Sequence, residues 1–159
     1  MLNVYSSKVL SDNQFAKMYE ILINNLFKTY PEYLAEKNKH DNKNNYNNLF
    51  NSIKTTEQYN VICFEERDLL IGYLSYSVIN DELWISEIQI REEYQGKGVL
   101  RKLIEKFVSM PELNDYDYIK IHINKRNIYS QKVFEHIGFK KIGESTIYKI
   151  DTENLIKWN

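Results

Sequence analysis

A short glycine-bearing turn, placed where a strand-like segment gives way to a helix-like segment, carries the strongest chemical signal in the sequence. The turn runs from Gln95 to Arg101 and reads QGKGVLR. The first amides of a helix have no internal partner and lie at the positive end of the helix dipole, and glycines let an anion approach the backbone. The turn therefore predicts a phosphate or diphosphate site, with the alternative that its glycines serve only the connection.

Two side chains in predicted strands could remove a proton from a substrate. Glu87 lies in the predicted strand 82–91, and His122 lies between two isoleucines of a later strand, on the opposite phase from them. A histidine titrates near neutrality and suits general-base catalysis. Each residue also has a plainer interpretation: a solvent-facing carboxylate for Glu87 and a half-exposed strand histidine for His122. Both therefore stay candidates at this stage.

Composition limits the classes of protein and partner. The chain has 159 residues, of which 43% are hydrophobic, enough for one domain spanning residues 1–159. Its 21 Lys and Arg against 22 Asp and Glu give a net charge of -1, which argues against nucleic acid or an anionic membrane surface as a partner. The single Cys63 lies in an apolar run and indicates core packing, without a disulfide framework or a metal site. No signal peptide or membrane span is recognisable, so a cytoplasmic protein is expected.

Hydrophobic periodicity predicts the elements that would position these groups. Ser11 and Gln14 have the spacing of a capping box at the start of a long helix. A helix with a polar face is expected within Lys37–Asn51, after a loop. The remaining expected elements are antiparallel strands at 61–64, 69–79 and 82–91, a helix at 100–108, a strand at 119–123, a helix at 127–137 and a strand pair across 139–150.

The predicted strand at 82–91 shows a change of phase. Its apolar residues change sides between Ile85 and Ile88. A β-bulge around Ser86 and Glu87 would produce this slip and would expose unpaired backbone groups. The alternative is a strand buried on both faces, with Trp84 filling the second face.

The turn and a second motif together resemble the GNAT superfamily of acyl-CoA N-acyltransferases. The acyl-CoA motif of that family, Gln/Arg-x-x-Gly-x-Gly/Ala, is matched by Gln95, Gly98 and, imperfectly, Leu100. A second motif, at the two ends of a short helix, is matched by Asn127, Ser130, Gly138 and Phe139. The expected order of elements is also similar to this family over nearly the whole chain. The resemblance implies a single α/β (α+β) domain with a mixed, mostly antiparallel sheet, splayed central strands and flanking helices.

The same resemblance implies a co-substrate and a reaction. The co-substrate would be acetyl-CoA, without a metal, and its arm would lie where the central strands part. The residues assigned to it are Ile88, Ile90, Gln95, Gly96, Lys97, Gly98, Val99, Leu100, Arg101, Asn127, Ser130 and Phe134. A neutral amine would attack the thioester directly, with a backbone amide near the bulge stabilising the oxyanion. The acceptor would be a small-molecule amine or a peptide terminus, held largely by residues 30–46, and a homodimer remains open.

Two positions depart from the family pattern. Leu100 replaces a small residue at the phosphate cradle, and its side chain is expected to turn into the core. Phe134 stands where many members carry the tyrosine that protonates the leaving thiolate, and a phenyl ring cannot donate a proton. Water, Tyr129 or Tyr148 could replace that acid, with water and Tyr148 favoured. The departure also keeps open an alternative function, an acyl-CoA-binding module with little or no turnover.

Overall fold

The strands and helices follow the expected order, with one addition at the C-terminal end. The computed structural model describes residues 1–6, 8–31, 42–56 and 59–158, with the backbone alone at 42–46. The strands are β1 (Leu2–Ser6), β2 (Asn60–Glu66), β3 (Leu69–Ile79), β4 (Glu82–Ile90), β5 (Tyr118–His122), β6 (Lys140–Lys141) and β7 (Ile147–Asp151). The helices are α1 (Asp12–Thr29), α3 (Asn42–Thr55), α4 (Val99–Val108), α5 (Ile128–Ile137) and α6 (Thr152–Trp158), with short 3-10 helices at Glu92–Tyr94 and Pro111–Asp115.

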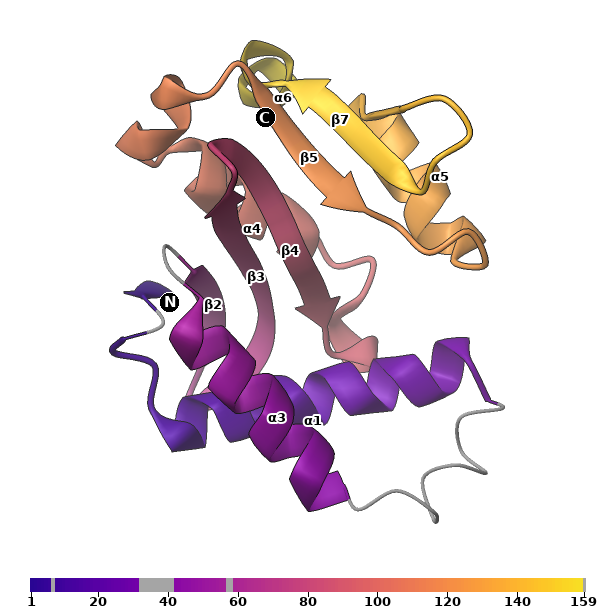
Figure 1. Cartoon of the computed structure of the whole chain (residues 1–159). Coiled ribbons are helices and arrows are strands. Elements are labelled where there is room, and N and C mark those ends of the chain that lie inside the picture. The colour runs from indigo at the N-terminus through magenta and orange to yellow at the C-terminus, as the bar shows by residue number, and fades with distance from the viewer. Residues whose placement is uncertain (7, 32–41, 57–58, 159) are drawn as a thin grey trace.

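The seven strands form one sheet in the order β1-β2-β3-β4-β5-β7-β6. All neighbours are antiparallel except β4 and β5, which are parallel. Figure 1 shows α1 and α3 in front of the part of the sheet that holds β2 to β4, with α4 behind it. The predicted fold class, a mixed and mostly antiparallel sheet flanked by helices, is confirmed.

Local sequence explains where the main helices begin. The Ser11 hydroxyl accepts a hydrogen bond from the Gln14 amide at 3.2 Å, and the Gln14 side chain accepts one from the Ser11 amide at 2.9 Å. This is the predicted capping box of α1. The expected helix within Lys37–Asn51 corresponds to α3, which extends further, to Thr55. Residues 37–41 of that expectation lie outside the described residues.

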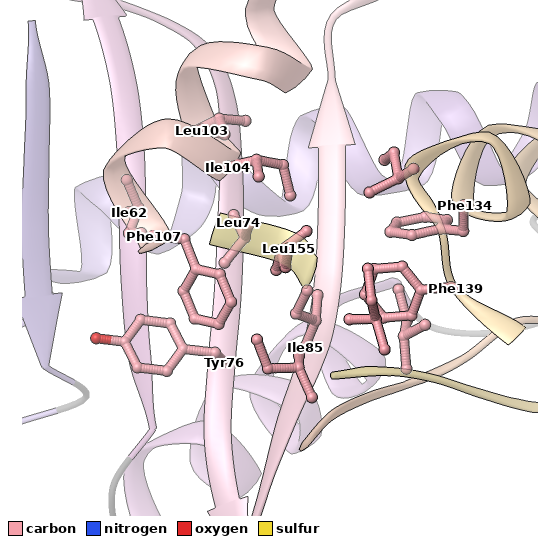
Figure 2. Close-up of a cluster of buried hydrophobic side chains, with 14 of the residues drawn as sticks. Ile62, Leu74, Tyr76, Ile85, Leu103, Ile104, Phe107, Phe134, Phe139 and Leu155 are labelled. Carbon is pink, nitrogen blue, oxygen red and sulfur yellow. The ribbon is translucent and has the colours of Figure 1, made fainter. Parts of the chain in front are cut away.

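Two hydrophobic cores hold the helices to opposite faces of the sheet. The α1-side core joins α1 to β2 and β3 through buried residues such as Phe15, Met18, Ile21, Val61 and Cys63. The α4-side core contains the buried residues of α4 and α5 and those of the strands facing them, including Leu103, Ile104, Phe107, Phe134 and Phe139. Figure 2 shows Phe107 beside Tyr76 at one end of this core, while Phe134 and Phe139 lie together at the other. As expected, Leu100 packs against the α4-side core.

The change of phase in β4 is a bulge. Ser75 pairs with Glu87, and the next residue of β3, Tyr76, pairs with Ile85, so Ser86 is the extra residue of β4. Because of this extra residue, Ile85 before the bulge and Ile88 after it both pack into the α4-side core. The alternative, a regular strand buried on both faces, is wrong.

Helix α6 was not expected from the sequence. It follows β7 directly and buries Leu155 completely in the α4-side core. The Thr152 hydroxyl at its start donates a hydrogen bond of 2.5 Å to the carbonyl of Tyr116, which precedes β5. The strand pair expected across 139–150 is present as β6 and β7, and the expected helix at 127–137 is α5, which ends at Gly138 with a φ of +113°.

Candidate active site

The central strands β4 and β5 lie side by side over only a few residues. They pair from Leu83 with Ile119 to Ile85 with Ile121. Beyond that point β4 runs on through the bulge to Ile90, and Figure 1 shows the two strands diverging. We call this region the β4–β5 splay, formed by residues 86–90 of β4 and by residues 122–127, from the last residue of β5 to the start of α5. Within the described residues, the β5-facing edge of β4 has no strand partner there, so its backbone groups could pair with an extended ligand.

The glycine turn lies at the end of β4 and presents open backbone amides. Gly96 and Gly98 have φ values of +71° and +78°, and Gly98 caps α4. Within the described residues, no hydrogen bond is found to the amides of Val99, Leu100 and Arg101, the first three residues of α4. A Cβ added to Gly96 or Gly98 would meet no atom within 4 Å. The turn therefore combines unpaired donors with open space, as a diphosphate requires.

Two cations of the turn have only weak internal contacts. The Lys97 ammonium lies 5.6 Å from the centre of the Tyr94 ring, and the Arg101 guanidinium lies 3.2 Å from a Glu105 carboxylate oxygen. All three charged side chains are exposed, and exposed pairs of this kind contribute little to stability. Turning the Lys97 and Arg101 side chains toward a bound phosphate would therefore cost little free energy.

Gln95 is exposed, and its side chain bonds back to the end of β4. Its Nε2 donates to the Ile90 carbonyl at 3.1 Å, and the Asn25 side chain of α1 donates to the same oxygen at 3.1 Å. Asn25 also donates to the Gln89 side-chain oxygen at 2.8 Å. These bonds tie the turn and α1 to the end of β4. They also engage the Ile90 carbonyl, which the family resemblance assigns to the cofactor arm, whereas Ile88 packs against the α4-side core.

The Glu87 carboxylate lies at the bulge, on the face of the sheet that carries the α1-side core. The Tyr73 hydroxyl of β3 donates to Glu87 Oε2 at 2.6 Å. Burial raises the pKa of Glu87, and hydrogen bonds from Tyr73 and then from Gln89 lower it in part. Among the described residues Glu87 has no cation as a partner. Ser75, its register partner on β3, is fully buried, and the Ser75 hydroxyl oxygen has no hydrogen bond.

His122, the second candidate base, lies at the end of β5 and is exposed. Its Nε2 is 2.6 Å from the hydroxyl oxygen of Thr146, in the turn before β7. No interaction between His122 and Glu87 is found in the described part of the chain. The structure therefore separates the two candidate bases, with Glu87 half-buried at the bulge and His122 exposed at the end of β5.

The aromatic residues considered for the acid lie in different environments. Tyr148 pairs with Ile121 across the sheet, is 1% exposed and belongs to the α4-side core, where burial and then Glu135 raise its pKa. Tyr129 is 70% exposed on the outside of α5. The Phe134 ring is 6% exposed and packs edge-on against Phe139, with ring centres 5.3 Å apart. The Phe134 ring is therefore part of the α4-side core.

Asn127 and Ser130 meet at the start of α5. Asn127 Oδ1 accepts a hydrogen bond from the Ser130 amide at 3.1 Å, which caps the helix. Asn127 is partly buried and lies after β5, on the other side of the splay from the glycine turn. Its cap leaves the amide nitrogen of the Asn127 side chain available as a donor.

Sequence reasoning missed the residues that bond to Glu87 and to the end of β4, namely Tyr73, Asn25 and Gln89, as well as Ser75, which lies opposite Glu87 on β3. Tyr73 and Ser75 lie in the strand 69–79, which is otherwise almost entirely buried, so hydroxyl groups there were an available signal. Asn25 carried no such signal, because an Asn on the polar side of a helix is ordinary.

A hollow of about 410 Å³ lies at the other end of the sheet, beside Tyr59, Tyr76, Leu83 and Glu112. Its walls include neither the turn nor Glu87, so it is separate from the candidate active site. In the portions of the chain that the structure describes, no group of three or more His, Cys, Asp or Glu could hold a metal ion. No helix in those portions is long and apolar enough to cross a bilayer.

Residues 28–149 match a family model described as an acetyltransferase (GNAT) domain. A curated relative, the spermine/spermidine N(1)-acetyltransferase of Bacillus subtilis, is 27% identical over 84 residues, which are 47% of this chain and 55% of that protein. The chain thus spans about half the length of the curated relatives it matches.

Solved structures share the fold over nearly the whole chain. The PaiA N-acetyltransferase of Thermoplasma acidophilum, solved in complex with coenzyme A, has a TM-score of 0.72 at 15% identity, covering 95% of this chain and 99% of that one. The ribosomal-protein-S18-alanine N-acetyltransferase of Escherichia coli has a TM-score of 0.62 at 16% identity, covering 96% and 94%. At these identities the likeness concerns the fold alone.

Proposed function

The chain belongs to the GNAT family of acetyltransferases, and we propose that it transfers an acetyl group from acetyl-CoA to a primary amine of a small molecule or a peptide terminus. The observation that carries the proposal is the placement of two groups at one splay: unpaired amides of α4 on the turn after β4, and the half-buried Glu87 carboxylate at the bulge of β4. The first suits the diphosphate of acetyl-CoA, and the second suits an amine.

The turn would hold the diphosphate through the amides of residues 99–101, with Lys97 and Arg101 turning in from the rim. The unpartnered edge of β4 beyond Ile85 would pair with the amide groups of the pantetheine arm, as a strand would. Asn127 would contribute its free side-chain donor from the opposite side of the splay. A backbone amide next to the bulge would stabilise the charge that develops on the thioester oxygen.

Glu87 is the general base of this proposal. A half-buried carboxylate without a cation partner favours a bound ammonium. The Ser75 hydroxyl beside it, which the Tyr59 hydroxyl also faces, offers a second acceptor for the same group. The raised pKa of Glu87 brings the carboxylate closer to the pH range in which it can accept the amine proton. His122 lacks this burial, since it is exposed and bonded to Thr146.

The transfer balances without a metal or a redox step. The amine nitrogen forms a bond to the acetyl carbon, the carbon–sulfur bond breaks, and the amine proton passes to Glu87. The leaving sulfur takes a proton from Tyr148 or from water. Tyr148, in the α4-side core on β7, and Glu87, at the bulge of β4, lie on opposite faces of the sheet. The amine would therefore approach from one face and the thiolate would depart toward the other.

The test is a free-thiol release assay with acetyl-CoA and a panel of amines. The panel holds spermidine and spermine, because relatives are named for them, together with simple monoamines, amino acids and short peptides with free N-termini. We expect thiol release with at least one amine and the matching N-acetyl product by mass spectrometry. Glu87→Gln should lower turnover roughly 10²–10⁴-fold, while His122→Ala, the matched change on β5, should leave it nearly unchanged.

Binding of coenzyme A by calorimetry accompanies the panel. Coenzyme A binding without thiol release from any amine would favour the alternative function, a binding module with little turnover. A large loss of turnover in His122→Ala, together with near-normal turnover in Glu87→Gln, would show that His122 is the general base. Absence of both binding and thiol release would refute the proposal.

A further inference from the structure

We infer that Tyr73 is a positioning residue of the acceptor site: its hydroxyl fixes the Glu87 carboxylate in the bulge and stabilises the ionised form of that carboxylate. The inference rests on the proposed role of Glu87 as the base. Tyr73 is fully buried on β3, and its hydroxyl donates to Glu87 Oε2 at 2.6 Å, a short bond of the kind formed with an ionised acceptor.

The bulge explains why this bond can form. Tyr73 is the register partner of Gln89, not of Glu87, so its side chain reaches diagonally along the sheet to the carboxylate. The register partner of Glu87 is Ser75, whose hydroxyl makes no bond. One carboxylate oxygen, Oε2, is therefore anchored within the chain. The Gln89 side chain, which Asn25 of α1 holds through its oxygen, is a second and weaker donor to the same carboxylate.

The surroundings of Glu87 are neutral except for the carboxylate itself. The titratable groups that face it are the Tyr73 hydroxyl of β3 and the Tyr59 hydroxyl before β2, with the Cys63 thiol of β2 close to both phenols. Burial raises the pKa of Cys63 to about 12 and holds the pKa of both tyrosines above their ordinary value. No charged group of α1 or β5 acts on Glu87 among the described residues. Tyr73 is thus the main internal support of the negative charge.

The hydrogen bond from Tyr73 predicts the direction in which the pH profile should move when the bond is removed. Without the Tyr73 hydroxyl, the ionised form of Glu87 loses the stronger of its two donors and keeps only Gln89. The carboxylate then protonates more readily, and the base becomes available only at higher pH. The rise of kcat/KM with pH should therefore move upward in Tyr73→Phe. On the acid side of that rise, kcat/KM of Tyr73→Phe should be roughly tenfold below that of the wild type, the effect of removing one hydrogen bond to a charged group. At the alkaline plateau, kcat/KM of the two proteins should agree within about twofold.

Tyr76 provides a matched control on the same strand. It is also buried, and its hydroxyl also donates to a glutamate, Glu112, at 3.0 Å, but on the opposite face of the sheet. Tyr76→Phe removes an equivalent bond with no link to Glu87. It should leave the pH profile unchanged, and comparing the thermal midpoints of the two variants shows whether either change acts through stability.

The experiment has two arms. The first measures kcat/KM against pH for the wild type and both Phe variants, with one amine throughout. The second titrates the Glu87 carboxyl carbon by NMR in protein with ¹³C-labelled glutamate, the signal being assigned by its loss in Glu87→Gln. In Tyr73→Phe the Glu87 titration should move to higher pH, and in Tyr76→Phe it should not.

The NMR arm separates this inference from the proposed function. If no amine is acetylated, an upward shift in Tyr73→Phe still supports the role of Tyr73 in holding the charge, although the base would then have no substrate. If Tyr73→Phe and Tyr76→Phe titrate alike, or if Tyr73→Phe lowers kcat/KM equally at every pH, the inference is wrong and Tyr73 is only a packing residue.

Discussion

Gly98 offers a way to test the phosphate site apart from the chemistry. Gly98→Ala adds a methyl group to a residue with a φ of +78°, where a Cβ would meet nothing within 4 Å. The folded chain therefore bears only backbone strain, roughly 1–2 kcal/mol for an L-residue in the left-handed region. For a domain of this size that strain should lower Tm by about 2–8 °C. A diphosphate drawn onto the amides of α4 would meet the new methyl group directly.

The expected loss in affinity follows from the bonds at stake. Displacing the diphosphate from one amide removes a hydrogen bond to a charged group, about 1.5–3 kcal/mol, which corresponds to a roughly tenfold to hundredfold weaker Kd for coenzyme A. Gly143→Ala is the control, because Gly143 also has a positive φ, +56°, and open space around a built Cβ, but lies between β6 and β7. It should lower Tm to a similar extent and leave Kd unchanged.

Calorimetric titration with coenzyme A and thermal melting of both variants decide the question. If Gly98→Ala binds coenzyme A as tightly as Gly143→Ala does, the diphosphate does not contact this turn. The reasoning from open amides would then fail, whatever the enzyme activity of the protein.

Two further predictions concern stability. Burial raises the pKa of Glu87 above its ordinary value of 4.5, so Glu87 binds more protons in the folded chain than in the unfolded chain between these two pKa values. The contribution of Glu87 to the free energy of unfolding therefore falls as pH rises from 4.5 toward the raised pKa. Tm measured against pH should therefore drop more for the wild type than for Glu87→Gln over that window, and parallel curves would contradict the assigned burial. Phe134→Tyr places a hydroxyl in the α4-side core beside Phe139, which should cost about 1–3 kcal/mol and bring no faster thiol release. An unchanged Tm with faster release at low pH would instead restore position 134 as the place of the acid.

The backbone features of the site could be predicted because each has a local signature. The apolar residues of β4 change sides of the strand at Ser86, and a bulge explains the change because one extra residue shifts the alternation by one. Gly98 precedes an amphipathic stretch, and a glycine at a helix start allows the left-handed conformation that it adopts. These inferences need only a few consecutive residues.

The bond between Tyr73 and Glu87 could not be predicted in the same way. It joins two strands diagonally, and the diagonal depends on the register of β3 against β4 on both sides of the bulge. Helix α6 was missed for a different reason: it has seven residues and buries only Thr152 and Leu155, too few for a periodic pattern to emerge. In both cases the deciding interaction is tertiary.

The short contact between β4 and β5 also bears on how the chain unfolds. Strands β1 to β4 pair in this order along the sheet over five to eight residue pairs each, whereas the parallel pairing of β4 with β5 covers three residue pairs. The α4-side core contacts the strands on both sides of that pairing. A native-state hydrogen-exchange experiment should therefore find two cooperative units, with β5, α5 and β7 opening before β2 and β3. A molecule lodged in the splay would touch both units at once. By binding to both units it would hold them together, so that the amides of β5 and β7 gain most of the protection from hydrogen exchange when it binds.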